Sequence, residues 1–255
     1  MELLEQFGLL AASFVGGAVN AVAGGGSLIT FPALLAAGYP ARVANVTNTV
    51  ALWPGYLGGS LGYGEELRYQ RRRIAKLVAP SVLGAIAGSA ILLSTSENAF
   101  ESLVPFLILF AVGLMLFQAR LTRLAGAHRP ARIDPHQTPL LLQPASFLLA
   151  VYGAYFGAGL GIITLAVFGI LIPDDLQRLN ALKGMSSLVV NAVAVIYFAA
   201  FGPVEWLPAI VMAMGALAGG YLGAGLARNL GPDRLRFGVI LFSGIIAVIL
   251  FVRQL

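Results

Sequence analysis

Two glycine-rich runs mark the places where this sequence could do chemistry. Gly24-Gly25-Gly26-Ser27 interrupts an apolar stretch near the start of the chain, and Gly157-Ala158-Gly159-Leu160-Gly161 interrupts another past its middle. A break of this kind exposes backbone N–H groups at the start of the next helical segment, and such groups bind anions together with the helix dipole. Glycines also let helices pack closely without any ligand. Because two breaks occur at corresponding places, we predict that they bind a ligand.

A polar stretch begins the next long apolar segment in each half. The first is Asn45-Val46-Thr47-Asn48, and the second is Asn180-Ala181-Leu182-Lys183-Gly184-Met185-Ser186-Ser187. A lysine in an apolar helix is costly unless it snorkels to the membrane surface or meets an anion, and both interpretations are open for Lys183. The predicted substrate-binding residues are Gly24, Gly25, Gly26, Ser27, Asn45, Thr47, Asn48, Gly157, Gly159, Gly161, Asn180, Lys183, Ser186 and Ser187.

The sequence offers no catalytic machinery at membrane depth. It contains no cysteine, its two histidines lie in one polar stretch, and its eleven acids fall in loops or at helix ends. A carboxylate pair, a histidine-based metal site and a buried proton-relay carboxylate are therefore excluded from the apolar segments. The glycine runs follow apolar helix and not a strand, so they are not phosphate-binding loops. We predict that the chain is not an enzyme and has no catalytic residues, metal site or cofactor.

Composition identifies the solvent that these segments need. Of the 255 residues, 58% are apolar and 11% are charged, whereas a soluble domain has about 25% charged residues. A soluble fold of this size cannot hide that much apolar surface, and several apolar runs reach the roughly 20 residues of a membrane-spanning helix. The runs do not alternate as barrel strands do. The sequence therefore predicts an all-α polytopic membrane protein.

The chain divides into two halves around a polar stretch. We predict a first membrane repeat over 1–119, a basic linker over 120–139 and a second membrane repeat over 140–255, with the first helix of each half broken at its glycine run. The expected apolar segments are 7–23, 27–38, 42–62, 74–94, 102–119, 140–157, 160–172, 179–200, 206–227 and 236–252.

The two halves resemble each other weakly but in consistent order. Residues 23–30 lie over 157–164 with a shift of 134, Asn45 lies over Asn180 with a shift of 135, and Gly84 and Gly88 lie over Gly215 and Gly219 with a shift of 131. Small residues also align easily in glycine-rich helices, so chance similarity is the alternative.

Loop charge favours an inverted repeat. The loop at 63–76 is basic and the loop at 95–101 is acidic, whereas the corresponding loops of the second half have the reverse order. Since basic loops face the cytoplasm, we predict oppositely inserted halves, a cytoplasmic linker and both termini outside. This arrangement leaves only Arg42 and Arg253 of the basic residues outside. A plain arrangement with both halves in one orientation is the alternative.

The motif around the first break resembles that of a known family. Ala23-Gly24-Gly25-Gly26-Ser27-Leu28-Ile29-Thr30-Phe31-Pro32-Ala33-Leu34-Leu35 is similar to the glycine-rich signature of the sulfite exporter TauE/SafE family, and residues 44–49 resemble its next polar stretch. The second half departs from the signature, because it has no triple glycine and no proline at the position of Pro32. The resemblance implies a bacterial-type carrier of the inner membrane for sulfite, sulfonates or related organic anions, often an exporter.

We therefore predict a secondary transporter, an exporter of a small anion such as sulfite or a sulfonate across the inner membrane, working by alternating access between inverted halves. The alternatives are an anion channel of the same architecture and a membrane scaffold that transports nothing. The expected partners are the small anion and membrane lipid, with no nucleic acid, and a homo-oligomer is left open.

Overall fold

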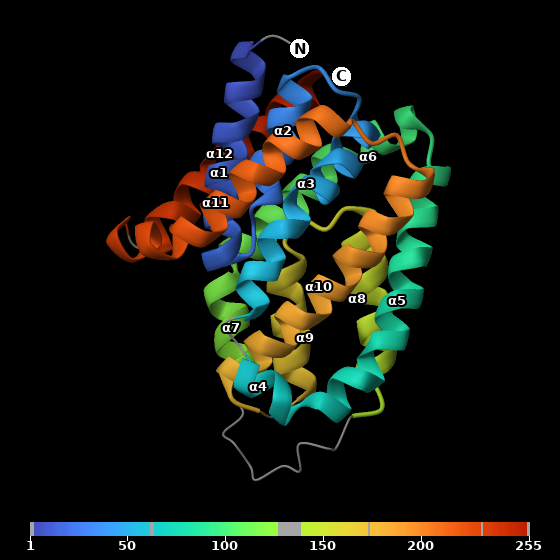
Figure 1. Ribbon diagram of the computed structural model, residues 1–255, viewed down its shortest axis with the longest axis vertical. Coiled ribbons are helices and arrows are strands. Elements are labelled where there is room, and N and C mark those ends of the chain that lie inside the picture. The colour runs from blue at the N-terminus through green and yellow to red at the C-terminus, as the bar shows by residue number, and fades with distance from the viewer. Residues whose placement is uncertain (1–2, 62–63, 127–138, 173, 231, 254–255) are drawn as a thin grey trace.

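The computed structural model describes residues 3–61, 64–126, 139–172, 174–230 and 232–253, and its regular elements in these ranges are all helices (Figure 1). In chain order they are α1 (Leu3–Ala23), α2 (Ser27–Ala36), α3 (Ala41–Leu61), α4 (Gly64–Tyr69), α5 (Arg71–Ser94), α6 (Glu97–Leu116), α7 (Gln118–Gly126), α8 (Leu142–Tyr155), α9 (Leu160–Leu171), α10 (Leu176–Phe201), α11 (Trp206–Leu230) and α12 (Pro232–Arg253).

Ten of these helices correspond to the ten apolar segments expected from the sequence. The two short helices α4 and α7 were not expected, because both are polar and neither contains a long apolar run. Helix α7 occupies the first part of the region predicted to be the linker, whose residues 127–138 lie outside the described residues.

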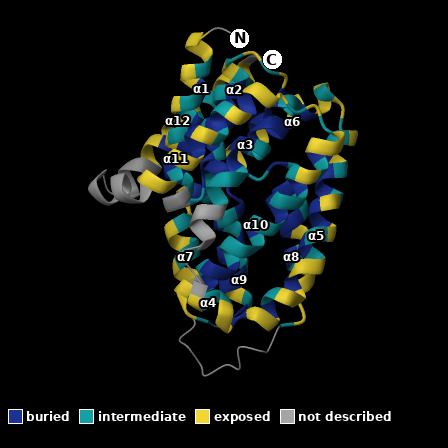
Figure 2. Cartoon of the chain, in the orientation of Figure 1, coloured by how far each residue is buried: buried dark blue, intermediate teal, exposed yellow. Residues whose placement is uncertain are grey.

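The apolar outer surface identifies the molecule as a membrane protein. Four described helical segments are long and apolar enough to cross a membrane, namely Leu3–Asn20, Arg71–Ser94, Glu97–Leu116 and Leu176–Phe201. Large apolar side chains such as Leu83 of α5 and Phe106 of α6 are exposed on their outer faces (Figure 2). Water would disfavour this surface, whereas lipid solvates it. The chain is therefore an all-α polytopic membrane protein, as predicted.

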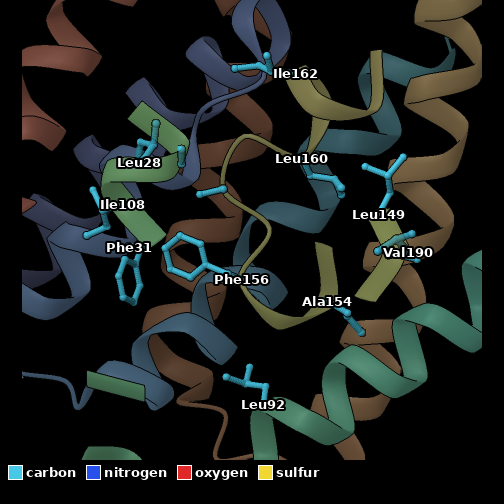
Figure 3. Packing of buried hydrophobic residues seen from close by; sticks show 14 of the residues in the cluster. Leu28, Phe31, Leu92, Ile108, Leu149, Ala154, Phe156, Leu160, Ile162 and Val190 are labelled. Atoms are coloured by element: carbon cyan, nitrogen blue, oxygen red, sulfur yellow. The ribbon is translucent and has the colours of Figure 1, made fainter. Parts of the chain in front are cut away.

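Two helical hairpins enter the molecule from opposite ends (Figure 1). The α1–α2 hairpin starts at the end where α12 finishes and turns back inside the molecule, whereas the α8–α9 hairpin starts at the end that holds α4. Their inner parts are in contact, since the rings of Phe31 in α2 and Phe156 after α8 pack edge to face with centroids 5.6 Å apart (Figure 3). The broken helices therefore meet in the interior.

Helices α5 and α8 approach each other closely along a seam of glycines. A Cβ atom on Gly84 or Gly88 would collide with the backbone carbonyl oxygen of Phe147 or Val151, respectively. Only a residue without a side chain permits backbone contact of this kind between membrane helices. Gly84 and Gly88 therefore fix how the first half packs on the hairpin of the second.

The reciprocal seam joins α11 to α1. A Cβ atom on Gly219 would collide with the carbonyl oxygen of Phe14, and one on Gly215 would lie 2.6 Å from that of Leu10. Gly215 and Gly219 are the residues that the sequence alignment placed over Gly84 and Gly88. Each half therefore presents the same pair of glycines to the hairpin of the other half.

Charged side chains distinguish the two ends of the molecule. Arg68 of α4, Arg72 of α5 and Arg123 of α7 are exposed at the end where the α8–α9 hairpin begins, which we call the basic end. Glu5 and Glu97 lie at the opposite end, which we call the acidic end, where Arg42 pairs with Glu97 at 3.5 Å.

Candidate functional site

The two glycine turns and Lys183 come together in the interior. An ideal Cβ atom on Gly161 would lie 3.9 Å from Cα of Gly24 and 3.8 Å from Cδ of Lys183. These residues come from the α1–α2 turn, the start of α9 and the second turn of α10. The structure thus brings together three predicted site residues that are far apart in the sequence, and it places a positive charge beside both breaks.

The ammonium group of Lys183 has a neutral partner. Its Nζ donates a hydrogen bond of 3.0 Å to Oδ1 of Asn180, and Nδ2 of Asn180 donates to the carbonyl oxygen of Leu176 at 3.0 Å. In the described ranges, the ion pairs involve Arg42, Arg73 and Arg178 and not Lys183. An ammonium group has three donors. A protonated Lys183 therefore has further donors with which it could bind an anion.

The first glycine turn is tightly packed. A Cβ atom on Gly25 would lie 2.7 Å from Cε of Met115, and one on Gly26 would collide with the carbonyl oxygen of Gly16. Gly24 adopts a left-handed conformation, with φ of 75°, and its N–H bonds the carbonyl oxygen of Asn20 at 3.2 Å. These contacts explain the glycines by packing and geometry alone. Ser27 is the first residue of α2 and is partly exposed.

The second glycine turn is held by its backbone conformation. Gly157 and Gly159 both have left-handed backbones, with φ of 76° and 74°, which glycine adopts without the steric cost that a Cβ atom imposes. The hydroxyl of Tyr152 donates to the carbonyl oxygen of Ala158 at 2.5 Å and braces the turn. Gly159 is the N-cap residue of α9, so the helix starts directly at this turn.

Asn45 connects the first half to the second glycine turn. Its Nδ2 donates a hydrogen bond of 2.9 Å to the carbonyl oxygen of Tyr155, and the residue is 1% exposed. The Oδ1 atom of the same side chain is buried and has no partner among the described residues. A buried acceptor without a donor is costly, so this oxygen is suited to a ligand that carries a hydroxyl group.

Asn48 faces a different partner from Lys183, although the two positions correspond. Helices α3 and α10 begin at residues 41 and 176, a shift of 135 that places Asn48 over Lys183. The hydroxyl of Thr30 in α2 donates to Oδ1 of Asn48, and both side chains are buried. Asn48 therefore links α2 to α3 within its own half.

Three predicted site residues contact other parts of the molecule. The Oγ1 of Thr47 accepts a hydrogen bond of 3.1 Å from the backbone N–H of Glu205, at the connection between α10 and α11. Ser186 lines a small gap between α10 and α5. Ser187 is buried, and its carbonyl oxygen accepts from Nδ2 of Asn191 at 2.8 Å. Of these three, only Thr47 makes a hydrogen bond between different elements, and Ser187 bonds within α10 itself.

Sequence reasoning missed a buried ion pair at the basic end. Arg73 is 1% exposed, and its guanidinium donates to Asp174 at 2.9 Å and to Oε1 of Gln70 at 2.8 Å. Asp174 also pairs with Arg178 at 3.3 Å. The pair ties α5 to the connection between α9 and α10. The sequence gives little signal for it, because Arg73 stands in a run of three arginines that is typical of a membrane-flanking loop.

Comparisons with known proteins agree over nearly the whole chain. A family model described as sulfite exporter TauE/SafE matches residues 9–250. A probable membrane transporter protein of Haemophilus influenzae is 30% identical, with 92% of this chain and 90% of that protein covered.

Two further relatives carry similar names. The probable membrane transporter protein ORF9 of Sinorhizobium is 26% identical, with 94% of this chain and 90% of the relative covered. The probable membrane transporter protein YfcA of Escherichia coli K12 is 24% identical, with 94% and 87% covered. No solved structure matches significantly.

Proposed function

Because the chain belongs to the sulfite exporter TauE/SafE family, whose members are membrane transporters and not enzymes, we propose that it is a secondary transporter that exports a small anion by alternating access. The substrate class is sulfite, a sulfonate or a related organic anion. The observation that carries the proposal is the junction of Gly24, Gly161 and Lys183, where two breaks and one positive charge meet.

The junction suits a small oxyanion for a physical reason. Lys183 supplies a charge with spare donors, and a charged donor to an oxyanion gives a stronger hydrogen bond than a neutral one. An apolar interior strengthens this attraction, because charges are poorly screened there. The helices that begin at the two breaks, α2 and α9, each start with N–H groups that have no acceptor within the helix. Asn180 orients the ammonium through its 3.0 Å hydrogen bond.

The arrangement of the halves supports alternating access. The opposed hairpins and the reciprocal glycine seams support an inverted repeat, an architecture in which the substrate site lies between the repeats. The buried pair of Arg73 and Asp174 joins the halves at the basic end, and the bond between Thr47 and Glu205 joins them at the acidic end. Access from either end requires the contacts at that end to separate.

The distribution of charge supports one orientation in the membrane. Basic loops remain in the cytoplasm during insertion, so the basic end and the linker face the cytoplasm and the acidic end faces outward across the inner membrane. In this orientation an exporter takes its anion from the basic end. Any proton that is carried must travel on the substrate or on Lys183, because the acids lie in loops or at helix ends. The free Oδ1 of Asn45 would accept a hydrogen bond from the hydroxyl group of a protonated anion.

The proposal is tested by the melting temperature of the purified protein with sulfite, sulfate, sulfoacetate, taurine, acetate and chloride. A ligand that binds only the folded state raises this temperature. We expect a rise with one of the sulfur oxyanions, its loss in Lys183→Ala and its retention in Lys76→Ala, because Lys76 is exposed and is the only other lysine in the sequence.

The absence of a rise with any of these anions at millimolar concentration would contradict the proposal and favour a scaffold. A rise accompanied by electrical conductance in a planar bilayer far above carrier rates would identify a channel. The two outcomes separate the proposed carrier from both alternatives.

A further inference from the structure

We propose that a groove at the basic end is a binding site for an anionic phospholipid, with the phosphate held by Arg68 and Arg71. The groove has a volume of about 290 Å³ and is lined by Leu67, Arg68, Arg71, Ile74, Ala75 and Met185. It lies where α4 and the start of α5 meet α10, so it is bounded by both halves of the molecule. Nothing in the transport cycle described above requires it.

The two arginines are available to bind a phosphate. Both are exposed, and neither forms an ion pair within the described ranges, where the paired arginines are Arg42, Arg73 and Arg178. A guanidinium binds phosphate through two parallel hydrogen bonds, which makes a pair of arginines a suitable headgroup site. Glu65 and Glu66 belong to the same short helix but do not line the groove.

An apolar gap continues from the groove between α5 and α10. Ile74 and Met185 line both the groove and this smaller gap, whose other walls include Leu77, Leu182 and Val189. Both helices run away from the basic end (Figure 1), and the gap between them is small, with a volume of about 10 Å³. Val78 is 40% exposed along this path, which leaves its outer side open to lipid. A headgroup site that leads into an apolar seam fits a phospholipid better than a soluble anion.

The groove is separate from the proposed anion site. Met185 follows Lys183 by two positions, which places their side chains roughly 200° apart around α10. Lys183 faces Gly161, whereas Met185 faces α5. A lipid bound here would therefore contact the opposite face of the helix that carries Lys183, and it would hold α4 and α5 against α10.

The test measures lipid binding in the absence of any transported anion, so it is independent of the proposed function. Full-length protein in detergent is titrated with phosphatidylglycerol, phosphatidylcholine or soluble glycerol 3-phosphate, and binding is followed by native mass spectrometry and melting temperature. We expect binding and a melting-temperature rise with phosphatidylglycerol only.

Two variants locate the effect. Arg68→Ala with Arg71→Ala should weaken phosphatidylglycerol binding about 30-fold, since each basic residue near an anionic headgroup contributes about a factor of five. Ala75→Trp keeps both charges but fills the groove, and it should also weaken binding. The matched control is Arg120→Ala with Arg123→Ala, an exposed basic pair on α7 that does not line the groove.

If Arg68→Ala with Arg71→Ala and the α7 double variant weakened phosphatidylglycerol binding equally, the lipid would be attracted to a basic surface in general. That result would overturn the proposal. An equal response to glycerol 3-phosphate would assign the arginines to a free anion, which would also overturn it. The melting temperature in phosphatidylcholine reports whether each variant is folded, and Ala75→Trp tests the groove even if the double arginine variant is not.

Discussion

The turn between α1 and α2 and the turn between α8 and α9 both break a helix with glycines, yet the glycines meet different physical needs. In the first turn Gly26 has an ordinary helical backbone, with φ of −56°, and is required because Gly16 leaves no room for a side chain. In the second turn Gly159 has a φ of 74°, and a Cβ atom there would lie 3.3 Å from Cδ1 of the Leu114 side chain and no closer than 3.7 Å to backbone.

Only one glycine has the same role in both turns. Gly24 and Gly157 have φ of 75° and 76° and each follows the first helix of its hairpin, which gives a shift of 133. The sequence alignment used a shift of 134 here and is corrected by one residue. In the triple glycine, Gly25 and Gly26 are thus required by close packing and Gly24 by its backbone conformation, and the absence of a triple glycine from the second half does not remove the turn.

The helices that follow the two hairpins, α3 and α10, differ at one corresponding position. The first half uses Asn48 to bind Thr30, whereas the second half has Lys183 at the corresponding position, beside both turns. The fold therefore has two similar hairpins but one charge. In the transporter that we propose, the second half would supply the electrostatic attraction for the anion and the first half a rigid backbone.

The largest expected effect comes from removing that charge. Lys183→Ala in proteoliposomes should abolish flux of the anion that raises the melting temperature, because the junction of the two glycine turns then loses the positive charge that offsets dehydration of the anion. Lys183→Arg should retain part of the flux. Lys76→Ala is the matched control and should leave flux unchanged. Undiminished flux in Lys183→Ala would remove the proposed role of this residue.

Moving the charge to the first half should not restore transport. In the double variant Asn48→Lys with Lys183→Asn, the new lysine would replace a buried side chain and would remove the acceptor that the hydroxyl of Thr30 uses. We expect a folded fraction below that of Lys183→Asn alone and no recovery of flux. Recovery of flux would mean that the two halves are interchangeable, contrary to the comparison.

Alanine substitutions separate the two uses of glycine. Gly26→Ala should lower the free energy of unfolding by about 1–3 kcal/mol through overpacking against Gly16. Gly38→Ala should cost about 1–2 kcal/mol through its left-handed backbone alone, since its φ is 86° and no atom lies within 4 Å of a Cβ there.

The loss of stability in Gly26→Ala should not be reversed by a second substitution at the neighbouring Gly16. Replacing Gly16 cannot relieve Gly26→Ala, because the clash is with the carbonyl oxygen of Gly16 and not with a side chain. Denaturant unfolding in detergent measures both variants. An unchanged free energy of unfolding in Gly26→Ala would show that the first turn has more space than its contacts indicate.

A smaller effect is expected at the contact between α2 and α3. Thr30→Val removes the donor to the buried Oδ1 of Asn48 while preserving shape, so the free energy of unfolding should fall by about 1–3 kcal/mol. Thr49→Val is the matched control, because the Thr49 hydroxyl bonds only the carbonyl oxygen of Asn45 one helical turn away. Equal losses of stability in the two variants would show that the hydrogen bond between Thr30 and Asn48 stabilises the fold no more than one within a single helix.

Apolar patterning predicted the long helices well. The segments expected at 42–62 and 179–200 are α3 (Ala41–Leu61) and α10 (Leu176–Phe201), because lipid allows few alternatives to an apolar helix. Helices α4 and α7 escaped prediction because they are short and polar and lie at the ends of the membrane helices.

The proximity of some candidate residues could be expected from the sequence, whereas the contacts of others could not. Broken backbone and a lysine in an apolar helix led to the prediction of Gly24, Gly161 and Lys183 as site residues, and the structure places these three next to one another. Thr47 and Ser186 belong to the same polar stretches, yet packing directs them to Glu205 and to α5. Nothing in the local sequence distinguishes these residues from their neighbours, because helix rotation is set by the partners.

The most direct test of the central claim is the protection of Lys183 from an amine-reactive reagent by the anion. The protein has two lysines, so mass spectrometry can follow Lys183 with Lys76 as an internal control in the same sample. We predict that sulfoacetate or another stabilising sulfur oxyanion slows modification of Lys183 relative to chloride and leaves modification of Lys76 unchanged. Equal modification of Lys183 with and without an anion that raises the melting temperature would contradict the placement of the anion at the two glycine turns.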